Sequence, residues 1–175
     1  MSERFKGIKA FAFDVDGVFT DGGILALPDG DLLRIFDAKD AFAVRMASMH
    51  GYALAVITGG RSESILKRFM TCGLKEEDVY LGSRDKIKDF NDFCQRHNLK
   101  AEDVMYFGDD VPDIPVMLSC GCGVCPSDAA DDVRAIADFV SDRPAGKGTV
   151  RSVIEKVMKL QDTWKLDIEL YEKNF

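Results

Sequence analysis

Residues 8–18 read Ile-Lys-Ala-Phe-Ala-Phe-Asp-Val-Asp-Gly-Val, and this stretch decides the fold. Residues 8–13 are a nearly continuous apolar run, which predicts a short strand that is covered on both faces. Two aspartates, Asp14 and Asp16, follow the run directly. Because open α/β sheets place their ligand sites at the carboxyl ends of strands, these two carboxylates mark the expected site edge of the sheet.

Similar apolar runs recur along the chain and alternate with segments that have the pattern of helices. We expect strands at residues 8–13, 52–57, 79–81, 104–107, 123–124 and 139–140. We expect helices at residues 41–49, 62–72, 86–97, 114–118, 130–137 and 150–160. This alternation predicts a doubly wound (Rossmann-like) α/β fold with a mainly parallel sheet.

One segment interrupts the alternation between the first strand and the first helix. The apolar runs 23–27 and 32–36 flank the turn sequence Pro28-Asp29-Gly30-Asp31, which predicts a β-hairpin that projects from the sheet at about residues 21–37. No linker follows, so residues 1–160 form one predicted domain. The remaining segment, residues 161–175, is apolar enough that we expect it to dock on its own domain or on a neighbouring subunit.

The composition excludes several classes of function. With 175 residues, 46% hydrophobic and 30% charged, the chain fits one globular domain. Its net charge of −7, with no basic block, argues against nucleic acid or an anionic membrane as a partner. No apolar run reaches the roughly 20 residues of a membrane helix, and Asp14 ends the N-terminal apolar run. We therefore expect a cytoplasmic protein.

The five cysteines predict reduced thiols rather than a disulfide framework, since their number is odd. Cys120, Cys122 and Cys125 lie close together, but no second pair of cysteines or histidines has the spacing of a zinc site. We interpret the three as small buried thiols in a strand-and-turn segment.

Three further elements bring chemistry to the edge that carries the two aspartates. Thr58-Gly59-Gly60 follows the second predicted core strand and offers a hydroxyl and backbone amides near a helix start, where anions bind. Lys86 follows the third strand, and Gly108-Asp109-Asp110 with Asp113 follows the fourth. Each element alone could be a cap, a turn residue or a solvated charge. Together they indicate a site for a hard cation and a phosphate, with an aspartate as nucleophile.

The order Asp14-Val15-Asp16-Gly17, Thr58, Lys86 and Gly108-Asp109-Asp110 with Asp113 resembles the four motifs of the haloacid dehalogenase superfamily. This resemblance covers nearly the whole chain. It implies that Asp14 is the nucleophile of a phosphoryl transfer, that Asp16 is the general acid and then base, and that Thr58 and Lys86 bind phosphate. It also implies a Mg²⁺ site formed by Asp14, the Asp16 carbonyl and Asp109, supported by Asp110 and Asp113.

The intervals between these motifs have room for the hairpin, a helix and a strand, but not for a cap domain. The chain is thus similar to the capless branch of the superfamily that contains the 3-deoxy-D-manno-octulosonate 8-phosphate phosphatases. This resemblance implies hydrolysis of a small phosphorylated sugar acid for lipopolysaccharide synthesis. It also implies a homotetramer in which the hairpin and the C-terminal segment cover a neighbour's site.

By position, the same resemblance implies substrate contacts along several segments. The implied residues are Asp16, Asp37, Ala38, Lys39, Asp40, Ala41, Arg45, Gly59, Gly60, Arg61, Arg68, Lys86 and Lys147. Many relatives carry arginine where Gly60 and Lys147 stand, and lysine does not replace arginine in a bidentate contact with a carboxylate. Either Arg61 reaches the sugar carboxylate instead, or the preferred sugar acid differs. On base rates, Arg45, Arg61 and Arg68 could also be solvated helix charges.

Two other functions are weighed against this one. A phosphatase that acts on N-acylneuraminate or deaminoneuraminate 9-phosphate would use the same motifs on a nine-carbon sugar acid. A receiver-type signalling domain also combines acidic residues, threonine and lysine on a doubly wound sheet. Its phosphoacceptor ends the third strand, whereas the paired carboxylates here end the first, so the order of the motifs argues against it.

Overall fold

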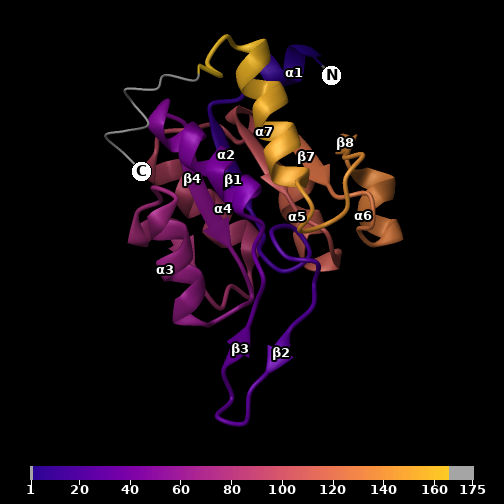
Figure 1. Ribbon diagram of the computed structural model, residues 1–175. Helices are drawn as coiled ribbons and strands as arrows, with labels where there is room; N and C mark the ends of the chain where they lie inside the picture. The colour runs from indigo at the N-terminus through magenta and orange to yellow at the C-terminus, as the bar shows by residue number, and fades with distance from the viewer. Residues whose placement is uncertain (1, 166–175) are drawn as a thin grey trace.

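The computed structural model describes residues 2–165, and its centre is a six-stranded parallel sheet (Figure 1). The strands lie in the order β5-β4-β1-β6-β7-β8, and every neighbouring pair is parallel. They are β1 (Ala10–Phe13), β4 (Ala53–Ile57), β5 (Val79–Tyr80), β6 (Val104–Phe107), β7 (Cys122–Cys125) and β8 (Phe139–Val140). The doubly wound α/β prediction is therefore confirmed, and β1 lies at the point where the strand order reverses.

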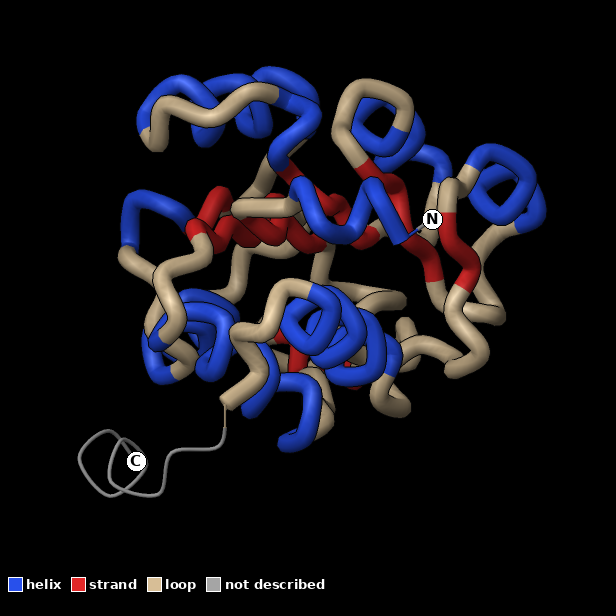
Figure 2. The backbone as a smooth tube through the Cα atoms, turned by 90° about the horizontal axis from the view of Figure 1, so that it is seen from above, coloured by secondary structure: helices blue, strands red, loops and turns tan. Residues whose placement is uncertain are grey.

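Helices cover both faces of the sheet, as the view in Figure 2 shows. They are α1 (Ser2–Gly7), α2 (Ala38–Met49), α3 (Glu63–Thr71), α4 (Lys86–Arg96), α5 (Ile114–Met117), α6 (Asp131–Ile136) and α7 (Thr149–Leu160). Short 3₁₀ turns occur at Glu76–Asp78, Ala101–Asp103 and Val111–Asp113. The predicted helices agree with these within a few residues. Helix α1 and the 3₁₀ turns were not predicted, because segments this short have no measurable hydrophobic period.

Strand β1 separates two hydrophobic clusters because successive side chains of a strand point to opposite faces. Phe11 and Phe13 pack against the cluster that includes residues of α1, α2, α3 and α7. Ala10 and Ala12 face the other cluster, to which α4, α5 and α6 contribute. All four side chains are fully buried. This two-sided burial explains why the run before Asp14 is continuously apolar.

The predicted hairpin is present and consists of β2 (Leu25–Ala26) and β3 (Leu32–Leu33), which pair antiparallel. It projects from the body of the molecule (Figure 1). The paired segments are shorter than the apolar runs that predicted them. Four large apolar side chains on the hairpin are exposed, namely Ile24, Leu25, Leu33 and Ile35.

Residues 161–165 pack on the chain's own domain. The Gln161 side-chain amide donates to the backbone carbonyls of Phe5 and Ile8, and its Oε1 atom accepts from the Tyr52 hydroxyl at 2.6 Å. The Trp164 ring lies edge-on to Phe42. Docking of residues 166–175 lies outside the described residues. Within residues 2–165, no helix is long and apolar enough to cross a membrane.

The cysteine cluster behaves as buried thiols. Cys122 and Cys125 lie in β7 and are fully buried, while Cys120 is partly exposed. Burial raises the pKa of the Cys120 and Cys125 thiols to about 11. All three are thus protonated at neutral pH, which fits a packing role.

A buried carboxylate joins the starts of α2 and α7. Asp40 is fully buried and accepts hydrogen bonds from the backbone amides of Gly148, at 3.3 Å, and Arg151, at 2.7 Å. These amides belong to the first turn of α7, where N–H groups have no partner within the helix. Burial raises the pKa of Asp40 to about 6. The structure therefore gives Asp40 another role than the substrate contact that the resemblance implied.

We expect the substitution Asp40→Ala to lower the free energy of unfolding by about 1–3 kcal/mol at pH 5, because two buried amides lose their acceptor. The loss should shrink as the pH rises to 8. The pKa of Asp40 is raised in the folded state, so its contribution is complete below about pH 4 and is lost as the pH passes about 6. Urea unfolding at both pH values measures this. The control Asp132→Ala, at an exposed position, should stay within about 0.5 kcal/mol, and an equal loss in both variants would contradict the role of Asp40.

Candidate active site

The carboxyl ends of the central strands surround a cavity of about 440 Å³. Nine residues that the sequence predicted for the site line it: Asp14, Asp16, Thr58, Gly59, Gly60, Lys86, Asp109, Asp110 and Asp113. Gly22, Ser83, Arg84 and Pro112 complete the wall and were not predicted. The core of the predicted site thus lies together in one cavity.

The ammonium group of Lys86 holds two carboxylates together. Lys86 is the first residue of α4, and its Nζ lies 2.9 Å from an oxygen of Asp14 and 2.7 Å from an oxygen of Asp113. Burial alone would lower the pKa of Lys86, but the two carboxylates outweigh it and raise this pKa above its usual range. Lys86 therefore stays charged although its side chain is only 7% exposed.

Asp14 follows β1, and its amide donates to the carbonyl of Phe107 at the end of β6. Burial raises the pKa of this carboxyl group to about 6, and the nearby Asp113 adds to the rise, while Lys86 opposes it. The carboxylate form that a nucleophile needs thus depends on Lys86.

Asp113 is fully buried and has all its acceptor positions in use. One oxygen accepts from Lys86 and from the Tyr106 hydroxyl, which is 2.6 Å away. The other accepts from the backbone amides of Asp109, at 3.1 Å, and Asp110, at 3.3 Å. Asp113 therefore orders the loop after β6. Asp110, in contrast, is exposed.

Asp109 has the chemistry of a metal ligand. One oxygen of each of Asp14, Asp109 and Asp113 lies within 4.8 Å of the others. The Oδ1 atom of Asp109 is buried and has no hydrogen-bond partner within residues 2–165. Burial raises the pKa of Asp109 to about 8, and the charges of Asp14 and Asp113 add to the rise. A hard divalent cation would pair with this oxygen, and carboxylates are the protein ligands that Mg²⁺ prefers.

Gly17 is required for this arrangement. Its φ of +84° lies in the left-handed region, and a Cβ atom there would lie 1.9 Å from Oδ2 of Asp109. Only glycine brings the backbone after Asp16 so close to Asp109. The Asp-Val-Asp-Gly sequence thus shapes the space between the two acidic segments.

The loop after β4 also lines the cavity. The buried Thr58 side chain accepts a hydrogen bond from the amide of Gly60 at 3.1 Å. The carbonyls of Thr58 and Gly60 accept from the amides of Ser83 and Gly82, which belong to the loop before α4. The loops that carry Thr58 and Lys86 are therefore fixed to each other.

The sequence analysis missed Arg34. Its guanidinium group, from the end of the hairpin, donates two hydrogen bonds to the Asp16 carboxylate: Nε to Oδ1 at 2.7 Å and Nη2 to Oδ2 at 2.8 Å. The Arg34 side chain is only 2% exposed, whereas that of Asp16 is 26% exposed. A single basic residue within the apolar run 32–36 was the signal that could have found it.

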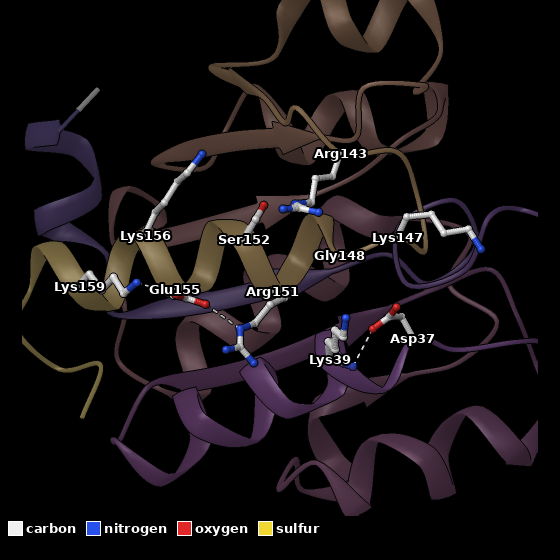
Figure 3. A pocket seen from close by; sticks show the side chains of 10 residues that line it. All are labelled: Asp37, Lys39, Arg143, Lys147, Gly148, Arg151, Ser152, Glu155, Lys156 and Lys159. Atoms are coloured by element: carbon white, nitrogen blue, oxygen red, sulfur yellow. Dashed lines mark hydrogen bonds and ion pairs between the residues drawn. The ribbon is translucent and has the colours of Figure 1, made fainter. Parts of the chain in front are cut away.

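Three predicted substrate contacts line another groove. Asp37, Lys39 and Lys147 lie along a basic groove of about 650 Å³ beside α2 and α7 (Figure 3). Figure 3 shows Arg151 pointing from α7 toward α2 and bound to Glu155. Within the described chain, none of the three predicted residues lines the cavity of Asp14.

The other predicted contacts also lie outside this cavity in the described part of the chain. Ala38 lies near the base of the hairpin, and Ala41 packs against the core. Arg61 lies next to Gly82, and Arg45 lies beside Gly73. The guanidinium carbon of Arg68 lies 6.0 Å from the centre of the Phe36 ring.

Comparisons with known proteins agree with this geometry. Residues 57–153 match the family model of haloacid dehalogenase-like hydrolases. The 3-deoxy-D-manno-octulosonate 8-phosphate phosphatase KdsC of Salmonella typhi is 33% identical over 164 residues, which are 94% of this chain and 85% of that protein.

Solved structures of such phosphatases have the same fold. The enzyme from Yersinia pestis superposes with a TM-score of 0.89 at 31% identity and covers 93% of this chain and 86% of its own. The enzyme from Moraxella catarrhalis, solved in complex with magnesium, phosphate and KDO, superposes with a TM-score of 0.88 at 28% identity. The superposition covers 93% of this chain and 92% of that one. The chain therefore belongs to the haloacid dehalogenase-like hydrolases, and within them it is a phosphoric monoester hydrolase without a cap domain.

Proposed function

We propose that the protein hydrolyses 3-deoxy-D-manno-octulosonate 8-phosphate to the free sugar acid and phosphate, as a step of lipopolysaccharide precursor synthesis. Its similarity to phosphatases of that name over more than nine tenths of its length supports this substrate. The observation that carries the chemistry is the buried Lys86 between Asp14 and Asp113, next to the unpaired oxygen of Asp109.

Mg²⁺ fits this site as a cofactor. Asp14 and Asp109 would hold it with their carboxylates and Asp16 with its backbone carbonyl, while Asp113 and Asp110 would support the loop. The buried Oδ1 atom of Asp109, which has no hydrogen-bond partner among the described residues, supports this assignment. When bound, Mg²⁺ supplies positive charge that stabilises the transferring phosphoryl group.

Asp14 acts as the nucleophile on phosphorus and forms an aspartyl phosphate. An anionic substrate is repelled by an acidic nucleophile, and Lys86 reduces this repulsion from within 3 Å of Asp14. The Thr58 hydroxyl and the Gly59 backbone, which line the same cavity, would bind phosphoryl oxygens. Asp16 also lines this cavity, but it is paired with Arg34 and not with Lys86, so its carboxyl group is separate from that of the nucleophile.

Asp16 serves both halves of the reaction. A sugar alkoxide is a poor leaving group, so Asp16 must give it a proton when the ester bond breaks. The resulting carboxylate then takes a proton from the water that attacks the aspartyl phosphate. The different partners of Asp14 and Asp16 suit their different roles.

The site is completed in a homotetramer. The exposed apolar side chains of the hairpin are a surface that a second copy would cover. The basic groove with Lys39 and Lys147 lies apart from the chain's own cavity, so these residues would contact substrate in a neighbour's site.

We expect wild-type protein with Mg²⁺ to release phosphate from 3-deoxy-D-manno-octulosonate 8-phosphate with at least a tenfold higher kcat/KM (about 1.4 kcal/mol) than from N-acylneuraminate 9-phosphate. Asp14→Asn should lower kcat by about 10³-fold or more, because the nucleophile is lost. Steady-state phosphate release measures both, and circular dichroism checks the fold. Comparable low rates on both substrates would defeat the substrate assignment, and an active Asp14→Asn would refute the nucleophile.

We expect Mg²⁺ to raise the melting temperature of protein treated with EDTA, since a ligand that binds only the folded state stabilises it. Asp109→Asn should weaken this response, with the apparent Mg²⁺ affinity reduced more than about tenfold. Thermal unfolding over a Mg²⁺ titration gives both quantities. Asp132→Asn, an exposed change of the same chemistry, should respond as wild type. An unchanged response in Asp109→Asn would show that the cation binds elsewhere.

We expect Ile35→Asp to shift the wild-type tetramer to smaller species in sedimentation velocity, because Ile35 is 88% exposed on the hairpin. Leu118→Asp is the matched control, since Leu118 is 66% exposed just after α5, outside the hairpin. The control should remain tetrameric. A wild-type protein that is monomeric and fully active would contradict the shared site.

A further inference from the structure

The two carboxylates of the Asp-Val-Asp motif are each paired with a different basic side chain. Asp14 is bound to Lys86 at 2.9 Å, inside the acidic cluster. Asp16 is bound to Arg34 through both of its oxygens and, among the described residues, does not belong to the group of three carboxylates that approach within 4.8 Å. Arg34 thus holds Asp16 outside the cluster, although only one residue separates the two aspartates.

Arg34 is inserted into the molecule from an exposed hairpin. Its neighbours Leu33 and Ile35 are exposed, while its own side chain is buried. One guanidinium nitrogen donates to the carbonyl of Leu32, and another lies 3.1 Å from the place that a Cβ atom of residue 60 would take. Gly60 therefore leaves the space that the Arg34 side chain occupies. The hydrogen bond with Asp16 raises the pKa of Arg34, so its charge is permanent.

We propose that Arg34 is the positioning residue for protonation of the leaving group and acts through Asp16; this rests on the proposed function. In the step concerned, a bond forms between an Asp14 oxygen and phosphorus, and the ester bond from phosphorus to the sugar oxygen breaks. That oxygen takes the proton of Asp16, which becomes a carboxylate. While Asp16 carries its proton, only its unprotonated oxygen accepts from Arg34. The carboxylate that forms when the proton leaves accepts both N–H groups, as in the structure, and a bidentate pair of this kind fixes its orientation.

The ion pair between Arg34 and Asp16 also connects the hairpin to the proposed general acid. Besides Arg34, the hairpin region contacts the body through a hydrogen bond from Ser62 to Asp31 at 3.2 Å and through the Phe36 ring, which lies against Phe69 and Arg68. The orientation of Asp16 and the place of the hairpin are therefore set by one ion pair. Without Arg34, the Asp16 carboxylate has no partner that keeps it out of the acidic cluster.

The test compares two esters with different leaving groups. An alkyl phosphate needs a proton on the departing oxygen, whereas 4-nitrophenolate departs without one. We expect Arg34→Gln to lower kcat/KM for 3-deoxy-D-manno-octulosonate 8-phosphate by roughly 10- to 100-fold, within the range of general acid catalysis. For 4-nitrophenyl phosphate, the loss should be less than about threefold. Arg34→Lys keeps the positive charge but lacks the two parallel N–H donors of a guanidinium group. Its kcat/KM for the alkyl ester should lie between those of Arg34→Gln and wild type.

Two further variants identify the route of the effect. In a protein that already carries Asp16→Asn, Arg34→Gln should lower kcat/KM for the alkyl ester by less than about a further threefold. A residue that acts through the Asp16 carboxyl group has nothing left to position once that group is gone. Ser62→Ala is the matched control: it removes the other polar tie of the hairpin, makes no contact with Asp16, and should leave kcat/KM for both esters within about twofold of wild type.

The outcomes are distinct. Equal losses on both esters in Arg34→Gln, with an active wild type, would overturn the positioning role and leave the proposed function intact. Full additivity with Asp16→Asn would also overturn it. A wild type that hydrolyses neither ester would overturn the proposed function and, with it, this role of Arg34.

Discussion

The site depends on one buried interaction, the contact of the Lys86 ammonium group with Asp14 and Asp113. Removing one partner of a buried ion pair leaves the other charge without compensation, which typically costs about 3–5 kcal/mol. Asp14 directly follows β1, Lys86 begins α4, and Asp113 ends the 3₁₀ turn that comes after β6. Their contact therefore fixes the relative positions of three segments that are distant in the sequence.

The charges around Lys86 explain how an acidic protein can bind a phosphate. Asp14, Asp109 and Asp113 are brought together in a buried space, and Lys86 offsets only part of their charge. The remaining negative charge suits a divalent cation, which in turn suits an anionic substrate. The net charge of −7 thus excludes large polyanions without excluding a small phosphate ester. The two N–H groups of Arg34 offset Asp16 separately.

The fold and the centre of the site could be predicted from the sequence, because both follow from local patterns of residues. Parallel strands end at the same edge, so residues after successive strands had to meet there, as Asp14, Thr58 and Asp109 do. The contact of Arg34 with Asp16 depends on how a hairpin folds back, which no hydrophobic period records. The contact of Asp40 with the start of α7 was not predicted for a similar reason, since its amide partners are more than 100 residues away in the sequence.

The two halves of the site have different origins in the fold. The half around Asp14 is built from buried strand ends and is fixed by Lys86 and the loops around it. The half around Asp16 is held by a hairpin that has few other contacts with the body. In a fold without a cap domain, the hairpin is the element that can change without disturbing the core. Under the proposed mechanism, sequence changes in the hairpin would act on the leaving group through Asp16, while the contact of Asp14 with Lys86 stays the same.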